Sequence, residues 1–303
     1  MPYYPMNDGE TLFVRRFGQG QPVLVLSGLG MLSWQWLVFL YPFKHQFEFI
    51  IPEWRGFGAS EKCKIPNQLN AIESHWNDVS FLIQQLKIQN PIVIAYSMGA
   101  TTAMHGMQYG EFGQHIKAYL HIDQTPQIAS NTDWPFGLMG TQYPQFHSVI
   151  QALSDFLGPY THYDYLSDLP KSAQKTLSKL WLDFIQLQNT KPIYLKILSS
   201  ALQNSWLQKK LLPSQRIDYM LWYLNTYLNH KEDYRNAVTR LEVPVHYFSG
   251  KNSKLYPIEG QKHIAKNTAN AKHIIFEKSG HAPLLSEPVK FKQQIQAFLL
   301  SHL

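Results

Sequence analysis

Ser97 is the serine of this chain whose surroundings best suit a nucleophile. It lies within residues 95–100, Ala-Tyr-Ser-Met-Gly-Ala, and an apolar run at 91–94 leads directly into that segment. The pattern predicts a strand, a sharp turn with the serine at its tip, and a helix. The small residues Ala95 and Gly99 lie two positions either side of Ser97, where a larger side chain would collide as the chain reverses. Backbone N–H groups at a helix N-terminus favour negative charge, so this serine is suited to nucleophilic attack.

A histidine near the end of the chain is the candidate base for this serine. Residues 274–280 read as an apolar strand followed by a Ser-Gly turn, and His281 comes next, ahead of a helical pattern over 288–303. A histidine on a loop after a late strand can reach a serine at the end of a central strand. There it would take the hydroxyl proton and return it to the leaving group. Most other histidines are expected to be surface or packing residues, among them His75, His105 and His230.

A glycine-rich turn near the start of the chain would complete such a site. The buried strand predicted at 23–26 is followed by residues 27–30, Ser-Gly-Leu-Gly. The turn lets the backbone N–H of Leu29 point at the serine, and with the N–H of Met98 it would form an oxyanion hole with two donors. A phosphate-binding loop is the alternative, but the third glycine of a dinucleotide fingerprint and the Lys-Ser/Thr pair of a P-loop are missing.

Taken in order, these motifs resemble those of the α/β-hydrolases over nearly the whole chain. Residues 27–30 resemble the family's His-Gly-x-Gly turn, with serine for histidine, and residues 95–99 resemble its nucleophile elbow, with alanine for the first glycine. Residues 53–60, Glu-Trp-Arg-Gly-Phe-Gly-Ala-Ser, resemble Asp-x-Arg-Gly-x-Gly-x-Ser, with glutamate for the first aspartate. Residues 279–288 resemble the histidine loop and the start of its closing helix. The resemblance implies a hydrolase with a Ser-His-acid triad.

The acid of that triad is missing from its usual position. In the family it lies three residues after the glycine that ends the penultimate strand, and a proline follows. Here the glycine is Gly250, the proline is Pro257, and Ser253 occupies the acid's position. No aspartate or glutamate occurs from 250 to 258. A histidine base needs a partner on its other ring nitrogen, so another carboxylate must supply it or the base is left without one.

We predict that Asp123 is this carboxylate. It ends the strand predicted at 118–122, and a right-handed connection would place that strand beside the strand that carries Ser97. Some α/β-hydrolases, including haloalkane dehalogenases, are known to carry their acid after this strand, and the resemblance extends to that variant. Asp133 is a weaker rival. The structural alternative is that Asp123 only caps the turn that follows it.

Short apolar runs alternate with helical stretches through the first 125 residues. The expected strands cover residues 12–17, 23–26, 47–51, 92–95 and 118–122, and an amphipathic helix is expected over 70–86. The alternation resumes at Val243. It predicts an α/β fold with a mostly parallel, doubly wound sheet that is covered on both faces.

Residues 131–230 interrupt this alternation with aromatic residues at helical spacing. These include Trp134, Trp206 and Trp222. We predict that the segment is a helical cap inserted into a hydrolase core made of residues 1–130 and 231–303. It would lie above the strand ends, where open α/β sheets bind ligands. Most of its aromatic residues are expected to form the cap's own core, and the remainder to roof an apolar pocket.

Composition excludes several classes of protein. With 303 residues and 45% apolar content, the chain can bury a sizeable core. No signal peptide or apolar run of membrane-spanning length is recognisable, and the single cysteine, Cys63, fits a reducing cytoplasm. No metal or cofactor motif is found. The net charge of +6 is spread out, which favours a solvated surface. An acidic acyl-carrier protein or an anionic membrane surface is a weaker interpretation of this charge, and no nucleic-acid-binding module accompanies it.

These observations predict an enzyme that hydrolyses carboxylic esters, with thioesters and carrier-bound acyl esters within the same chemistry. Ser97 would attack a small apolar acyl ester, His281 would shuttle the proton, and Asp123 would orient the histidine, without a cofactor. Water would then release the acyl group. The alternative is a ligand receptor on the same fold whose triad has decayed, which the empty acid position favours. A scaffold without a ligand fits the retained serine and histidine poorly.

Overall fold

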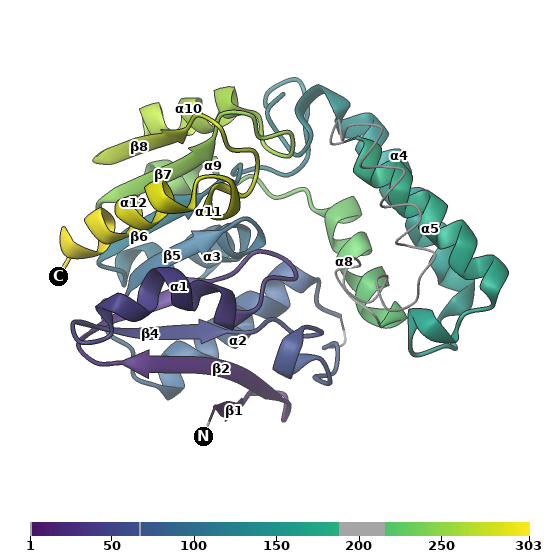
Figure 1. Cartoon of the computed structure of the whole chain (residues 1–303), viewed down its shortest axis with the longest axis horizontal. Helices are drawn as coiled ribbons and strands as arrows, with labels where there is room; N and C mark the ends of the chain where they lie inside the picture. Colours follow the sequence, from purple (N-terminus) through teal and green to yellow (C-terminus); the bar gives the residue numbers. More distant parts are fainter. Residues whose placement is uncertain (1, 67, 188–215) are drawn as a thin grey trace.

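An eight-stranded sheet forms the centre of the part of the chain that the computed structural model describes, residues 2–66, 68–187 and 216–303 (Figure 1). The strands lie in the order β1-β2-β4-β3-β5-β6-β7-β8. Neighbours from β4 to β8 in that order are parallel, whereas β2 runs antiparallel to β4 and β1 antiparallel to β2. The strands are β1 (Tyr3–Pro5), β2 (Thr11–Gly18), β3 (Gln21–Leu26), β4 (Phe47–Pro52), β5 (Ile92–Tyr96), β6 (Ala118–Ile122), β7 (Val245–Gly250) and β8 (Ala271–Phe276). The predicted mostly parallel α/β sheet is confirmed, and the edge strand β1 is an addition to the prediction.

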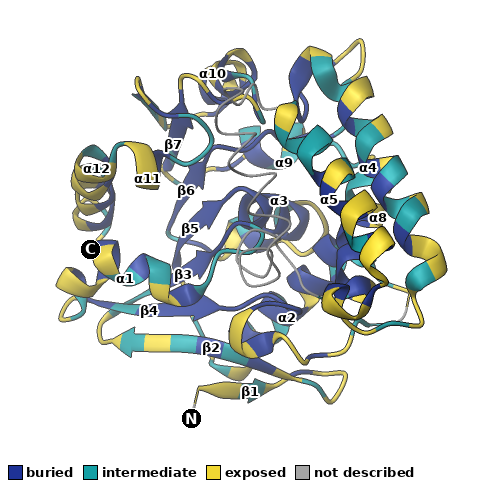
Figure 2. Cartoon of the chain, turned by 45° about the vertical axis from the view of Figure 1, so that its right-hand side comes forward, coloured by how far each residue is buried: buried dark blue, intermediate teal, exposed yellow. Residues whose placement is uncertain are grey.

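Helices cover both faces of the sheet, so the strands between them are buried (Figure 2). They are α1 (Leu37–Leu40), α2 (Ala71–Gln85), α3 (Met98–Tyr109), α9 (Arg235–Thr239), α10 (Ile258–Asn267), α11 (Pro283–Ser286) and α12 (Pro288–Leu300). Trp76 of α2 and Met104 of α3 belong to the apolar cluster on one face, and Phe39 of α1 and Phe291 of α12 to the cluster on the other. Strands β5 and β6 are buried over their whole length, because a parallel strand between two helical layers has no solvated side. No helix in the described ranges is both long and apolar enough to cross a bilayer.

Helix α2 shows how the sequence sets these elements locally. Asn70 caps its N-terminus, and the Asn70 side chain accepts hydrogen bonds from the backbone N–H groups of Ile72 and Glu73 at 2.9 and 3.0 Å. The Glu73 side chain in turn accepts the N–H of Asn70, which completes a capping box. The helix expected over 70–86 is therefore observed with bounds that differ by one residue at each end.

Between β6 and β7, the described residues contain three further helices, which form a layer beside the sheet (Figure 1). This helical layer consists of α4 (Tyr143–Leu157), α5 (Lys171–Gln186) and α8 (Ile217–Asn229). Phe146, Leu153 and Trp181 belong to an apolar cluster of its own. Tyr219 and Tyr223 of α8 instead belong to the cluster of the sheet, and thus join the layer to the core. Trp206, one of the aromatic residues assigned to the cap, lies outside the described residues.

Candidate functional site

Ser97 occupies a strained turn between β5 and α3. Its backbone has φ +52° and ψ −121°, a conformation that residues with a side chain rarely adopt and that costs about 1–3 kcal/mol. The turn is anchored because the N–H of Ser97 donates to the carbonyl oxygen of Ile122 at 3.0 Å. A Cβ atom on Gly99 would lie 2.1 Å from the carbonyl oxygen of Leu26, so this position accepts only glycine. The expected steric reason for the small residue is therefore present, and the serine hydroxyl projects at the carboxyl end of a central strand.

His281 reaches Ser97 from the loop that follows β8. Its Nε2 atom lies 3.0 Å from the Ser97 Oγ atom. The loop packs tightly on the end of β7, because a Cβ on Gly250 would lie 1.9 Å from the carbonyl oxygen of Gly280. The ring of Tyr96 stacks on the imidazole with centroids 5.2 Å apart, and the Tyr96 hydroxyl donates to the carbonyl oxygen of His281 at 3.2 Å. The imidazole is thus held by its backbone and by its ring.

Asp123 lies on the other side of the imidazole, at the end of β6. Its Oδ2 atom is 2.7 Å from the Nδ1 atom of His281, and its side chain is fully buried. Further donors approach the same carboxylate: the N–H of Gly250 at 2.8 Å, the hydroxyl of Ser253 at 2.7 Å and the amide of Gln261 at 3.1 Å. A buried carboxylate is tolerated when its oxygens accept hydrogen bonds in this way. The structure therefore brings Ser97, His281 and Asp123 together.

Ser253, at the position where the family usually carries its acid, supports the carboxylate of Asp123 instead. The Ser253 hydroxyl donates to Asp123, so the loop after β7 keeps its place and supports a carboxylate from the neighbouring strand. The rival Asp133 is exposed, and its carbonyl oxygen accepts a hydrogen bond from Arg235. Sequence reasoning did not identify Gln261, which lies on α10 and carries no motif that would point to the site.

The glycine-rich turn lies against the serine turn, since Leu26 of β3 pairs with Ala95 of β5. A Cβ atom on Gly28 would lie 3.4 Å from the Ser97 Cβ atom. The turn is held by two tryptophans: the Trp36 indole donates to the Ser27 hydroxyl at 3.0 Å, and the Trp54 indole donates to the Ser27 carbonyl oxygen at 2.8 Å.

The two expected oxyanion donors come from these adjoining segments. Leu29 lies in the turn, and Met98 is the first residue of α3. The N–H groups in the first turn of a helix have no acceptor within that helix, so they are available to a ligand. The arrangement can therefore offer backbone donors on the side of the serine that faces the turn.

Arg55 belongs to the segment that resembles Asp-x-Arg-Gly-x-Gly-x-Ser, and its side chain forms ion pairs that join parts of the fold. It forms a bidentate pair with Asp78 of α2, with nitrogen to oxygen distances of 2.7 and 2.6 Å, and a further contact with Asp8 at 2.7 Å. Burial alone would lower the pKa of the Arg55 guanidinium, but the hydrogen bonds to Asp78 and Asp8 hold it above its usual value. Arg55 is thus a permanent cation inside the fold.

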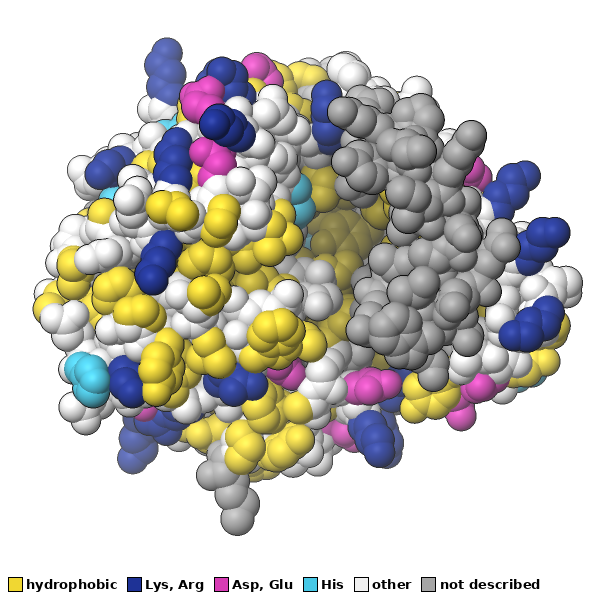
Figure 3. Space-filling model, in the orientation of Figure 1, with side chains coloured by type: hydrophobic (Ala, Val, Ile, Leu, Met, Phe, Trp, Pro, Cys, Tyr) yellow, Lys and Arg dark blue, Asp and Glu magenta, His cyan; other side chains and the backbone are white. Residues whose placement is uncertain are grey.

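Figure 3 shows the surface hollowed at the centre of the view, with hydrophobic side chains at the bottom of the hollow. The hollow lies toward the side to which the carboxyl ends of the parallel strands point (Figures 1 and 3). Ser97 and Asp123 follow β5 and β6 at these ends. The candidate site and the hollow therefore lie on the same side of the molecule.

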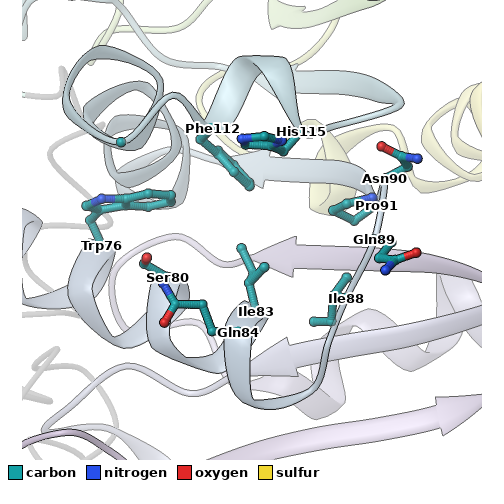
Figure 4. Close-up of a pocket in the computed structure, with 11 residues that line it drawn as sticks. Trp76, Ser80, Ile83, Gln84, Ile88, Gln89, Asn90, Pro91, Phe112 and His115 are labelled. Atoms are coloured by element: carbon teal, nitrogen blue, oxygen red, sulfur yellow. The ribbon is translucent and has the colours of Figure 1, made fainter.

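A separate cavity of about 460 Å³ lies near the start of β5, at the opposite end of that strand from Ser97. Figure 4 shows Trp76 and Ile83 of α2 on one side of it and Phe112 and His115 on the other. Pro91, which also lines it, precedes β5, whereas Ser97 follows that strand. The length of β5 thus separates this cavity from the serine turn.

Cys63 is a poor nucleophile in this structure. Its thiol is buried and donates to the carbonyl oxygen of Thr11 at 2.9 Å. Burial raises the pKa of the thiol to about 11, so the thiol stays protonated at neutral pH. Within residues 2–66, 68–187 and 216–303, no group of three or more His, Cys, Asp or Glu side chains could hold a metal ion.

Comparison with known proteins agrees with this fold. A family model described as alpha/beta hydrolase fold matches residues 21–288. The AB hydrolase superfamily protein YisY of Bacillus subtilis is 22% identical, with 98% of both chains covered. A pimeloyl-acyl-carrier protein methyl ester esterase of Legionella pneumophila is 21% identical, with 95% of this chain and 99% of that protein covered. A solved esterase from Exiguobacterium antarcticum has a TM-score of 0.65 at 19% identity, with 98% of both chains covered, which shows the fold.

Proposed function

This chain belongs to the α/β-hydrolase fold family, and on that premise we propose that it is a serine hydrolase of carboxylic esters. The observation that carries the proposal is the continuous path of hydrogen bonds from Ser97 Oγ to His281 Nε2 and from His281 Nδ1 to Asp123 Oδ2, at 3.0 and 2.7 Å. This is the geometry in which a histidine takes a proton from a serine while a carboxylate holds its tautomer.

In the proposed first step, the Ser97 oxygen attacks the ester carbonyl and its proton passes to Nε2 of His281. The carbonyl oxygen becomes an oxyanion, which the N–H groups of Leu29 and Met98 stabilise. Asp123 accepts a hydrogen bond from the Nδ1–H group of His281 throughout and stabilises the imidazolium. The carbonyl then re-forms, the bond to the alcohol oxygen breaks, and His281 gives its proton to that oxygen.

The second step reverses these roles with water in place of serine. Water attacks the acyl-enzyme and gives its proton to His281, and the Ser97 oxygen leaves and is reprotonated by the imidazolium. Apart from the ester and water, no further reactant is needed, because the proton that His281 removes in each step is returned to the leaving oxygen. The carboxylic acid product departs, and Ser97 and His281 are back in their starting protonation states.

A small apolar acyl ester is the substrate class that we propose. The apolar floor of the hollow near the strand ends supports this choice, and we propose that residues 131–230 act as the cap over it. Two relatives at low identity are named as esterases, one of them a methyl ester esterase of an acyl-carrier protein conjugate. A carrier-bound acyl ester lies within the same chemistry, with an acidic carrier protein as the partner.

The test is turnover of p-nitrophenyl esters of increasing acyl chain length, together with labelling by a fluorophosphonate probe. We expect one label per protein, on Ser97, and turnover that disappears in the Ser97→Ala variant. Thr102→Ser, on α3 one turn beyond the serine, is a matched control that must keep its activity. A correctly folded protein that is neither labelled nor active would favour the receptor alternative instead.

A further inference from the structure

Tyr256 lies in the loop between β7 and α10, the loop in which the family usually carries its acid. It is buried, with 2% of its surface exposed. Its N–H donates to the Ser253 hydroxyl at 3.3 Å, and its carbonyl oxygen accepts the Gln261 amide at 3.0 Å. Ser253 and Gln261 both also donate to Asp123. The backbone of Tyr256 is therefore fixed to the same groups that hold the carboxylate.

The side chain of Tyr256 extends from this backbone into the candidate site. Its ring centroid lies 5.4 Å from that of the His281 imidazole. Its hydroxyl lies near the side chains of Gln124 and Ser97, both of which act to lower the pKa of that hydroxyl. A phenol group beside both the serine and the imidazole is not needed for the triad itself, because the serine already has its base and the base already has its carboxylate.

The Tyr256 hydroxyl also keeps its proton. Burial raises the pKa of Tyr256 well above its usual value, and the nearby Tyr227 hydroxyl and Asp123 carboxylate act in the same direction. At neutral pH the group is therefore a neutral phenol, which can donate a hydrogen bond and cannot serve as a base.

The geometry of ester cleavage indicates which oxygen of the substrate such a hydrogen-bond donor would face. In the tetrahedral intermediate the oxyanion must face the N–H groups of Leu29 and Met98, whereas the alcohol oxygen must face His281 Nε2, which protonates it. The Tyr256 ring lies 5.4 Å from the imidazole that protonates this oxygen, and its hydroxyl lies near Ser97, so we place the hydroxyl on the alcohol side.

We propose that Tyr256 is a further catalytic residue, whose hydroxyl donates a hydrogen bond to the leaving-group oxygen of the ester. The inference rests on the proposed ester hydrolysis. As the bond between the carbonyl carbon and the alcohol oxygen breaks, that oxygen takes the bonding electron pair and receives a proton from His281. Tyr256 keeps its own proton throughout and stabilises the charge that develops before the transfer is complete.

This role predicts a dependence on the leaving group. An alkoxide is a strong base and carries much developing charge, so a methyl or ethyl ester needs the donor. A p-nitrophenoxide leaves without help. The experiment therefore compares kcat/KM for the ethyl and p-nitrophenyl esters of one acid in the wild type and in Tyr256→Phe, which keeps the ring and removes the hydroxyl.

We expect Tyr256→Phe to lower kcat/KM for the ethyl ester about tenfold or more and to change that for the p-nitrophenyl ester less than about threefold. Tyr234→Phe is the matched control, because it also removes a buried hydroxyl that contacts a histidine, His105 at 3.1 Å. It must leave the ratio of the two rates unchanged. An equal loss on both esters in Tyr256→Phe, or no loss on either, would overturn the leaving-group role.

Two further measurements separate the possible failures. Fluorophosphonate labelling of Ser97 must survive in Tyr256→Phe, since fluoride is a good leaving group. If the wild type is neither labelled nor active on any ester, the proposed function fails and this inference with it. If Tyr256→Phe does not fold, replacement of Tyr256 by 3-fluorotyrosine makes the hydroxyl more acidic at nearly the same size. That replacement must weaken the dependence of the rate on the pKa of the leaving alcohol, and an unchanged dependence would contradict the inference.

Discussion

Asp78 and Asp123 are both buried carboxylates, with 2% and 0% of their side chains exposed, yet they have different partners. Asp78 faces the guanidinium of Arg55 through two hydrogen bonds. Asp123 faces one imidazole and otherwise neutral donors, the backbone of Gly250 and the side chains of Ser253 and Gln261. The first carboxylate has a permanent counter-charge, and the second acquires one only when His281 takes up a proton.

We infer that this difference distinguishes a structural ion pair, Arg55 with Asp78, from the proposed catalytic pair, His281 with Asp123. The Arg55 pair joins the loop after β4 to α2, and its attraction is constant through any reaction cycle. Around Asp123, the neutral donors hold the carboxylate in place without neutralising it. In the proposed reaction, this carboxylate can therefore stabilise the imidazolium that forms for part of the cycle. Replacing the carboxylate by an amide should therefore lower mainly the turnover at Asp123 and mainly the stability at Asp78.

The largest effect is expected for Asp123→Asn. An asparagine NH₂ group facing His281 would make Nδ1 an acceptor and move the ring proton to Nε2, where it blocks proton transfer from Ser97. We expect kcat to fall about 10³- to 10⁴-fold while the protein still folds. Steady-state kinetics with a p-nitrophenyl ester measures the loss. Asp133→Asn, at the exposed rival position, is the matched control, and near-full activity of Asp123→Asn would remove Asp123 from the triad.

A double variant sharpens this result. In Asp123→Asn combined with Ser253→Asp, a carboxylate returns to the position that the family normally uses, on a loop already within 2.7 Å of residue 123. We expect part of the lost kcat to return. Recovery that is absent although the protein folds would mean that the loop after β7 no longer presents position 253 to the imidazole.

The next effect in size is expected for Asp78→Asn, and it concerns stability. The variant leaves the buried Arg55 with only Asp8 as a carboxylate partner among the ion pairs described, so we expect the free energy of unfolding to fall by about 3–5 kcal/mol. Urea denaturation measures the loss. Asp8→Asn, whose side chain is 32% exposed, should cost less than about 1 kcal/mol. Turnover per folded molecule should remain near the wild-type value in both variants. A large loss of kcat in folded Asp78→Asn would break the distinction between the two carboxylates.

Acid should destabilise the protein through buried histidines near both carboxylates. Burial lowers the pKa of His75 to about 3, with Arg55 acting in the same direction, and lowers that of His121 to about 4, where Asp123 acts in the opposite direction. The unfolded chain binds these protons below its ordinary pKa near 6.5 while the folded protein does not. Stability present above pH 6.5 is therefore lost as pH falls toward 4, by up to about 1.4 kcal/mol per pH unit for each histidine.

Urea denaturation at several pH values from 7.5 to 4.5 tests this dependence. Both folded pKa values lie below this range, so we expect His75→Gln and His121→Gln each to reduce the acid-induced loss by a similar amount. An acid-induced loss that is unchanged in either variant would show that its histidine takes up a proton in the folded protein as readily as in the unfolded chain.

The smallest effect is expected for Trp222→Phe. The Trp222 indole donates to the carbonyl oxygen of Leu69 at 2.8 Å and packs against His75, so it joins α8 to α2 on the side of Arg55. We expect a loss of about 1 kcal/mol in the free energy of unfolding and no change in the preferred acyl chain length. The panel of p-nitrophenyl esters and urea denaturation measure the two quantities. A shifted chain-length preference would instead make Trp222 part of the specificity pocket.

The sequence predicted the parts of the molecule that depend on short-range patterns. Alternating apolar runs predicted the strands, and the small residues around Ser97 predicted the sharp turn. Asp123 required one further step, because its proximity to the serine follows from strand order and the handedness of connections. The contacts of Ser253, Gln261 and Tyr256 could not be predicted, since they depend on the directions of side chains that leave one loop and a helix. No spacing in the sequence encodes those directions.

The most direct test of the account is to trap the acyl-enzyme. The wild type would be mixed with excess p-nitrophenyl acetate, quenched in acid within milliseconds to seconds, digested and examined by mass spectrometry. We expect a burst of p-nitrophenol and a single acetyl group on the peptide that contains Ser97, with neither in Ser97→Ala. Turnover without an acyl adduct on Ser97, or an adduct that persists on another residue in Ser97→Ala together with full activity, would contradict it.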